Sequence, residues 1–264
     1  MMDAAIASAV EVPGVPPLDD LREWLGHLGL TFAADLVKEE LHEAVRLNRA
    51  PHEVLGRLLR GEIESRDERR VRTALKLSNL PGGTTLGNFD FAFQPGVDRR
   101  QVEGLATCEF VREHTNVLLQ GPPGVGKTHL AVALGVRAIE QGFGVIFYRL
   151  EEMLHELRRD LGAPPAKLRR RKCFSASLLI VDEMGFEPMD REQASLFFRL
   201  VSYRYQRGST IITTNKSVKD WPGILAGDEA MTAAILDRLL HRCAVLNIRG
   251  RSYRLQEIEQ NMNP

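Results

Sequence analysis

The chain of 264 residues is 44% hydrophobic and 27% charged, a balance typical of a folded globular protein. This composition excludes a mostly disordered chain, and since no stretch approaches 18 consecutive apolar residues, no membrane-spanning helix is expected. Lys plus Arg and Asp plus Glu each number 35, so the net charge is zero, and only local clustering of charge can indicate a nucleic-acid partner.

The N-terminal residues and the cysteines both indicate the compartment. The first residues carry Asp3 and no basic segment, and they end in the proline-rich VEVPGVPP, so residues 1–17 are predicted to be a flexible leader and not a signal peptide. Cys108, Cys173 and Cys243 lie far apart and form no CxxC pair, which argues against a zinc site or a disulfide framework. A reducing, cytoplasmic location is therefore expected.

Helical periodicity follows the leader. Apolar residues recur on one helical face from residue 18 to 28, with Asp19 or Asp20 as the expected cap. Thr31 is expected to cap a second helix and Pro51 to occupy the first turn of a third. A charged helix is expected from about residue 62 to 77.

The sequence changes character at PGG, residues 81–83. We expect a small all-helical N-terminal domain over 18–80 and a second domain over 81–264. The second domain begins with NFDFAFQPG, an aromatic-rich loop or short strand, and a helix from about 99 to 113. Apolar strands then alternate with helices, which predicts an α/β fold with a parallel sheet. The expected strands are 116–120, 144–148, 178–182 and 210–214.

The first of these strands leads into GPPGVGKT and then into an apolar helix, the context in which GxxxxGK[ST] forms a phosphate loop. Its glycines let successive backbone N–H groups point at a phosphate, and the helix adds its positive N-terminal end. Lys127 is expected to reach the β- and γ-phosphates, and Thr128 to offer its hydroxyl to Mg²⁺. The predicted nucleotide-binding residues are Gly121, Pro122, Pro123, Gly124, Val125, Gly126, Lys127, Thr128 and His129, the last expected only to pack or hydrogen-bond locally.

Two later strands end in polar residues. LLIVDE is a continuous apolar strand that ends in Asp182 and Glu183. Asp182 is expected to hold Mg²⁺, and Glu183 to polarise a water molecule for attack on the γ-phosphate. TIITTN ends in Asn215, which is expected to help orient that water. Because a kinase gains nothing from a residue that activates water, the pattern favours ATP hydrolysis.

The ordered set GPPGVGKT, LLIVDE and TTN resembles an AAA+ ATPase. Within that superfamily the sequence is similar to the IstB-type transposition helper ATPases, which are relatives of the DnaC helicase loaders. The resemblance rests on FDFAFQPGVDRRQV, GPPGVGKTHLAVALG, DEMGFEPM, ILDRLLHR and GRSYRL. It implies an oligomeric ATPase that assembles on and remodels duplex target DNA and recruits a partner transposase.

The resemblance also implies roles for arginines. Arg238 in ILDRL matches the position of a finger that completes the neighbouring subunit's site, with Arg242 as the alternative. Arg254 in SYRL matches a second sensor that acts on the nucleotide of its own subunit.

A basic segment lies between the second and third expected strands. Its first half forms a helix whose apolar face runs from Leu150 to Leu161, and the segment after GAPP is strongly basic. Lys and Arg here would contact DNA phosphates without reading sequence; a solvated face or a partner-binding patch is the alternative. The predicted DNA contacts are Arg158, Arg159, Lys167, Arg169, Arg170, Arg171 and Lys172.

Three other interpretations remain open. A replicative helicase loader similar to DnaC would share the chemistry but act on single-stranded DNA. A metabolite kinase would be a monomer with a substrate pocket, and Glu183 and Arg238 argue against it. A nucleotide-gated DNA scaffold would bind ATP with negligible turnover. Phe89, Phe91 and Phe93 are expected mainly in the core, with contact to the nucleotide base as the alternative.

Overall fold

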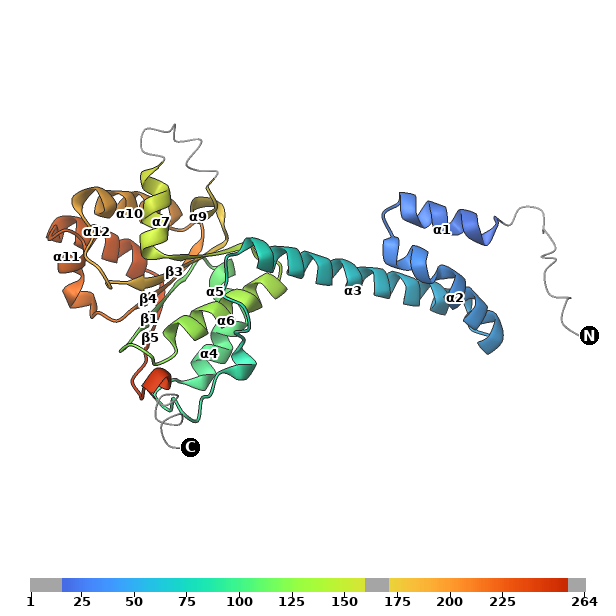
Figure 1. Cartoon of the computed structure of the whole chain (residues 1–264), viewed down its shortest axis with the longest axis horizontal. Helices are drawn as coiled ribbons and strands as arrows, with labels where there is room; N and C mark the ends of the chain where they lie inside the picture. Colours follow the sequence, from blue (N-terminus) through green and yellow to red (C-terminus); the bar gives the residue numbers. More distant parts are fainter. Residues whose placement is uncertain (1–15, 160–170, 256–264) are drawn as a thin grey trace, which may run out of the picture. The chain divides into compact units, whose positions relative to one another are not determined.

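The computed structural model describes residues 16–159 and 171–255 (Figure 1). The chain divides into two compact units, residues 1–70 and 71–264, here called the first unit and the second unit. The division falls inside one helix, ahead of the boundary predicted at residue 81, because Val71, Ala74 and Leu75 of that helix pack against the core of the second unit. No helix in the described ranges is long and apolar enough to cross a membrane.

The first unit is helical. It contains α1 (Leu18–His27), α2 (Thr31–Leu47) and most of α3 (Pro51–Leu77). The two helices expected over residues 51–77 are one, because glycine at positions 56 and 61 is tolerated inside a helix that is packed elsewhere. Its small core consists of Ala33, Val37, Ala44, Val54 and Leu58.

The start of α2 is capped from a distant residue. The prediction that Thr31 caps α2 is wrong, since Thr31 is the first helical residue and Leu30 is the N-cap without a side-chain hydrogen bond. Glu62 of α3 takes that role: its carboxylate accepts hydrogen bonds from the backbone N–H groups of Phe32 at 2.8 Å and Ala33 at 3.2 Å. Neither Asp19 nor Asp20 caps α1, where both lie in the first turn.

Glu62 is a buried charge with several partners. Its carboxylate also accepts hydrogen bonds from Arg66 at 2.9 Å and Arg69 at 3.4 Å. Burial alone would raise the pKa of Glu62, but the hydrogen bonds from Ala33, Arg66 and Phe32 together hold it below its usual value. The carboxylate therefore stays ionised at neutral pH and joins α3 to the start of α2.

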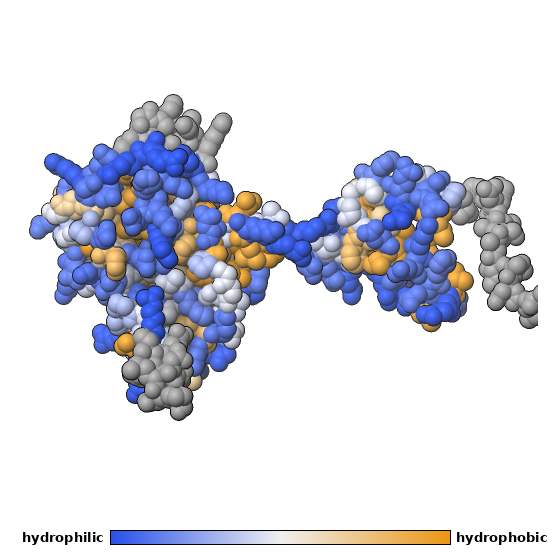
Figure 2. Space-filling model, in the orientation of Figure 1, coloured by the Kyte–Doolittle hydropathy of each residue, from blue (hydrophilic) through white to orange (hydrophobic). Residues whose placement is uncertain are grey.

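Large apolar side chains are exposed on the first unit (Figure 2). Its core buries few side chains, as expected for a unit of this size. The exposed side chains are Trp24, Leu28, Val45, Leu47, Leu55, Leu59 and Ile63.

The second unit contains a parallel sheet, and within the described residues its strand order is β2-β3-β4-β1-β5. The four predicted strands are confirmed. β5 was not predicted, because CAVLN follows a helical apolar pattern without a turn signal. The strands are β1 (Asn116–Gln120), β2 (Val145–Arg149), β3 (Leu178–Met184), β4 (Ser209–Thr214) and β5 (Cys243–Asn247).

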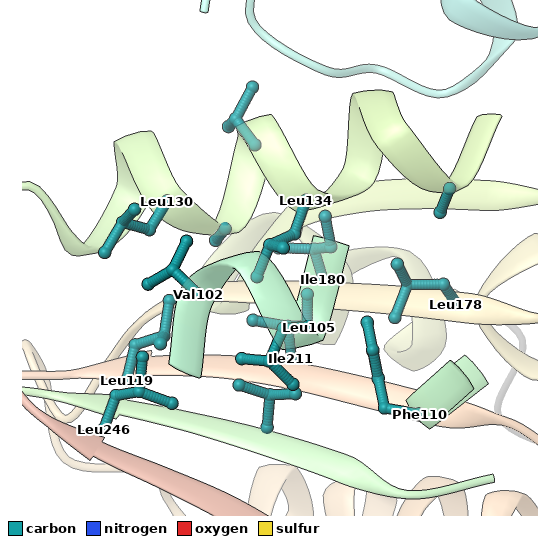
Figure 3. Packing of buried hydrophobic residues seen from close by; sticks show 14 of the residues in the cluster. Val102, Leu105, Phe110, Leu119, Leu130, Leu134, Leu178, Ile180, Ile211 and Leu246 are labelled. Carbon is teal, nitrogen blue, oxygen red and sulfur yellow. The ribbon is translucent and has the colours of Figure 1, made fainter. Parts of the chain in front are cut away.

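Helices cover both faces of this sheet, so alternate strand residues enter two separate cores. One face carries the end of α3 together with α4 (Arg99–Ala106), α5 (Glu109–Arg112) and α6 (Lys127–Glu140). Figure 3 shows this core, with Leu130 and Leu134 of α6 on one side and Ile211 of β4 on the other, and Leu105 of α4 and Ile180 of β3 between them. The single helix expected over 99–113 is interrupted at Cys108, whose φ is 59°.

The other face carries the remaining helices. Tyr148, Leu179 and Ile212 from three strands pack here against Met153 and Phe197. The segment NFDFAF forms no strand: it follows a short 3-10 helix, η1 (Leu86–Asn88), as a loop. The helices on this face are α7 (Leu150–Arg158), α9 (Lys172–Ser175), α10 (Arg191–Arg204), α11 (Trp221–Ile224) and α12 (Glu229–Leu240), and the 3-10 helix η2 (Val218–Asp220) precedes α11.

Candidate active site

A cavity of about 480 Å³ lies at the carboxyl ends of β1, β3 and β4. In a parallel α/β sheet this edge is where ligands bind, because loops and helix N-termini converge there. Its walls come from the phosphate loop, the ends of β3 and β4, the loop that follows η1, and residues 253–254. The predicted motifs, which are far apart in sequence, therefore meet at one cavity.

Two positions of the phosphate loop have backbone angles that favour glycine. Gly124 and Gly126 have φ angles of 80° and 94°, in the left-handed region that glycine adopts without strain. A Cβ atom at Gly124 would also lie 2.0 Å from the hydroxyl of Ser252. The backbone N–H of Tyr253 donates to the Gly124 carbonyl at 3.0 Å. The loop is thus held from outside by the C-terminal segment and leads directly into α6.

Lys127 begins α6 and lines the cavity. Its ammonium group donates hydrogen bonds to the carbonyl oxygens of Gly121 and Pro122, both at 2.7 Å, which holds the charge over the loop. Burial lowers the pKa of Lys127, the Asp182 carboxylate opposes this shift, and the positive charge of Arg254 adds to it. Two cations therefore flank the cavity, as a polyphosphate requires.

Thr128 and Asp182 form the predicted metal pair. The Thr128 hydroxyl lies 2.9 Å from Oδ1 and 3.1 Å from Oδ2 of Asp182, which is buried at the end of β3. Thr213 of β4 also donates to Asp182. These are hard oxygen ligands, and they fit Mg²⁺ that arrives with nucleotide phosphates and keeps several water ligands. No group of three or more His, Cys, Asp or Glu side chains that could hold a metal occurs in the described part of the chain.

Glu183 has an unusual backbone conformation. Its φ is 63°, and the register between β3 and β4 shifts between Val181 and Met184, so the residue forms a bulge. Its backbone N–H donates to the Thr213 hydroxyl at 3.0 Å. Its carboxylate lines the cavity and lies 3.7 Å from Arg149 Nε. The two neighbouring carboxylates therefore have different surroundings, since Asp182 is buried whereas Glu183 is exposed and lines the cavity.

The remaining predicted catalytic residues fall into two groups. Asn215, directly after β4, and Arg254 both line the cavity. Arg238 does not: its guanidinium donates to the Ala234 carbonyl at 2.6 Å and lies 5.2 Å from the ring centre of Phe198. Arg242 is exposed and its side chain contacts no hydrogen-bond or ion-pair partner in the described residues.

Two aromatic residues, Phe89 and Tyr253, line the cavity. Phe89 is buried yet lines the cavity, with its ring near Gly126, so it serves both the core and the site. The Tyr253 ring packs against Phe93 at 4.5 Å, and its hydroxyl donates to the Asp90 carbonyl at 2.6 Å. Tyr253 was missed by sequence reasoning, although it precedes Arg254 in the GRSYRL segment. His129 packs locally: its Nε2 lies 2.9 Å from the Thr85 carbonyl oxygen, and it also borders the cavity.

The predicted DNA contacts have different surroundings. Arg158 forms ion pairs with Asp190 at 2.6 Å and Glu192 at 2.7 Å, and these hydrogen bonds raise its pKa. Arg159 is exposed after the end of α7, and Arg171 is half-buried. Lys172 donates to the Leu77 carbonyl at 3.1 Å. Lys167, Arg169 and Arg170 lie outside the described residues.

The fold and this cavity define a P-loop ATPase of the AAA+ superfamily. The model of the IstB-like ATP binding protein family matches residues 24–261. The chain therefore belongs to that family, and it binds and hydrolyses ATP.

Two named relatives are similar in sequence to this chain along nearly its whole length. The chain is 42% identical to an insertion sequence IS21 ATP-binding protein from Pseudomonas aeruginosa, over 91% of this chain and 90% of that protein. It is 37% identical to the insertion sequence IS5376 ATP-binding protein from Geobacillus stearothermophilus, over 90% and 94%.

Solved structures share the fold at lower identity. The crystal structure of DnaI matches 65% of this chain and 96% of its own, with a TM-score of 0.54 and 20% identity. The replication initiator DnaA, solved with AMPPCP and single-stranded DNA, matches 70% of this chain and 56% of its own, with a TM-score of 0.52 and 19% identity.

Proposed function

We propose that this ATPase assembles on duplex DNA when it binds ATP, remodels that DNA, and recruits or stimulates a transposase in the cytoplasm. The observation that carries the proposal is the match along nine-tenths of the chain to ATP-binding proteins named for insertion sequences. A transposase is the DNA-processing partner that such an element requires. The relatives' names support the transposition context, and the charges discussed below support the contact with DNA.

Glu183 acts as the general base in the proposed hydrolysis. It is exposed and lines the cavity, where its carboxylate can accept a proton from a water molecule aimed at the γ-phosphate. Asn215 lines the same cavity and can orient that water through its amide. Lys127 and Arg254 neutralise phosphate charge, and Thr128 and Asp182 hold Mg²⁺, which supplies further charge neutralisation when bound.

The position of Arg238 supports the proposed homo-oligomer. Its guanidinium does not line the cavity of its own chain, so it can act on a nucleotide only from a second subunit. An arginine that enters a neighbour's site stabilises the charge that develops on the transferring phosphoryl group. Arg242, which is exposed on the same part of the chain after α12, is the alternative finger.

The proposed DNA surface comprises the basic segment after α7. Arg159 and Lys172 are exposed on either side of residues 160–170, and Arg171 adds a third charge. Arg158 is the weakest of the predicted contacts, because two carboxylates already pair with it. Contacts of this kind bind phosphates without sequence preference and weaken with salt.

Particle mass measured by light scattering tests the proposal. The protein is mixed with duplex or single-stranded DNA of equal length, in the presence of ATP or ADP, and Lys127→Ala serves as the control with strongly weakened nucleotide binding. Growth that requires both ATP and duplex DNA is the expected result. Growth on single strands alone would instead support a helicase loader, and a monomer under every condition would contradict assembly.

A further inference from the structure

The last turns of α3 carry two exposed cations that belong to the second unit. Arg72 and Lys76 are four residues apart, so they lie on the same face of the helix. Val71, Ala74 and Leu75 occupy the face that packs against the core. In the described residues, neither Arg72 nor Lys76 has a hydrogen-bond or ion-pair partner for its side chain.

In the earlier part of α3, most of the arginines form ion pairs. Arg66 and Arg69 pair with the buried carboxylate of Glu62, and Arg70 pairs with Asp67. Four arginines of α3 in the first unit, Arg57, Arg66, Arg69 and Arg70, thus have acidic partners, whereas the exposed Arg60 has none among the described residues. Folding therefore accounts for these four cations but not for Arg72 and Lys76.

A third cation joins them from a distant part of the sequence. Lys172 of α9 donates to the carbonyl of Leu77, which is the residue after Lys76. The positive charge of Lys172 suits the negative end of the helix. Lys172 has no acidic partner among the described residues, so this contact adds a like charge beside Lys76. The hydrogen bond brings the end of α3 to the start of the basic segment's last helix (Figure 1).

We propose that Arg72 and Lys76 form, with Lys172, a contact for the phosphate backbone of duplex DNA. This inference rests on the proposed function and adds to it a surface from outside the basic segment. Cations without counter-charges in the fold are available to a polyanion, and each phosphate neutralised releases counterions from the DNA. The carboxylates of Glu151 and Glu152 lie in the first turn of α7, where they would repel a phosphate backbone.

Salt-dependent binding of the full chain to duplex DNA tests this inference. The double variant Arg72→Gln with Lys76→Gln keeps good helix formers and removes both charges. The matched control is Arg100→Gln with Lys219→Gln, which removes two exposed, unpaired cations from α4 and η2 of the same unit. Binding is measured by fluorescence anisotropy over a series of salt concentrations in the presence of ATP.

The double variant should bind on the order of tenfold more weakly at low salt, and its plot of log affinity against log salt should be about two less steep. The control should match the wild type. If the wild type binds and the double variant has the same affinity and slope, or if the control changes equally, this inference is wrong while DNA binding stands. If the wild type binds neither duplex nor single strands, the proposed function fails and this inference fails with it.

Discussion

The two units of this protein differ in what determines their structure. In the second unit, motifs read locally along the chain end at one edge of one sheet, where Lys127, Glu183 and Asn215 line one cavity. In the first unit, the start of α2 is determined by Glu62, about thirty residues further along the chain. The residues of the nucleotide site can therefore be recognised from short motifs in the sequence. The small helical unit instead depends on one carboxylate that is remote in sequence, and it leaves apolar side chains exposed.

The substitution Glu183→Gln in the second unit should have the largest effect, which is a loss of ATP hydrolysis. The amide keeps the shape of the side chain but cannot accept a proton from water, so steady-state ATP hydrolysis should fall by about a thousandfold while ATP binding persists. The exposed neighbour Glu187→Gln, which does not line the cavity, should hydrolyse at the wild-type rate. Normal turnover by Glu183→Gln would remove the residue from the role of base.

Lys127→Ala removes an ammonium held over the phosphate loop. Losing a charge-assisted contact to phosphate costs about 3 kcal/mol, so ATP affinity should fall by about a hundredfold in calorimetric titration. Lys219→Ala, an exposed lysine of η2, should bind normally. Hydrogen exchange of α2 should be unchanged in Lys127→Ala, because the phosphate loop is not part of the first unit. Faster exchange of α2 in this variant would contradict the difference drawn between the two units.

Glu62→Ala disrupts the first unit by removing the distant cap of α2. Two backbone N–H groups and two arginines lose their acceptor, which should cost about 2 kcal/mol. Hydrogen exchange followed by mass spectrometry should therefore be about 30-fold faster in α2 and unchanged in α6. Glu64→Ala, exposed on the same helix, is the control. Equal exchange in the two variants would show that the cap contributes nothing.

The dependence of the stability of the first unit on pH should be the smallest of these effects. The pKa of Glu62 is lowered in the folded chain, so the stability it contributes is present above its unfolded value of about 4.5 and is lost as the pH falls through the folded value. Exchange in α2, corrected for its intrinsic pH dependence, should therefore accelerate below about pH 4.5 in the wild type. Glu62→Gln should flatten this change, and an equal change in both would contradict the assignment.

Much of the second unit could be predicted because its signals are local. The strand, the glycine loop and the helix that follows were readable from GPPGVGKT, and the buried strand was readable from LLIVDE. β5 could not be predicted, because its apolar residues continue a helical pattern. The bulge at Glu183 also escaped prediction, since a left-handed glutamate is imposed by the neighbouring strand and by the loop after it.

The unpredicted parts of the site depend on contacts between distant segments. Tyr253 reaches the cavity because its backbone bonds to Gly124, which no spacing in the sequence encodes. The paired state of Arg158 depends on two carboxylates at the start of α10. Both arginines are exposed, but Arg158 pairs with two carboxylates whereas Arg159 has no ion pair among the described residues, and the sequence does not distinguish them.

We propose that a second subunit supplies Arg238 to the nucleotide site. This proposal is tested most directly by mixing Lys127→Ala, which keeps the finger but binds ATP only weakly, with Arg238→Ala, which binds ATP but lacks the finger. Each variant alone should be nearly inactive, and ATP hydrolysis should reappear in the mixture on duplex DNA. If the mixture stays as inactive as its parts while both variants still assemble, Arg238 does not act between subunits and the account is wrong.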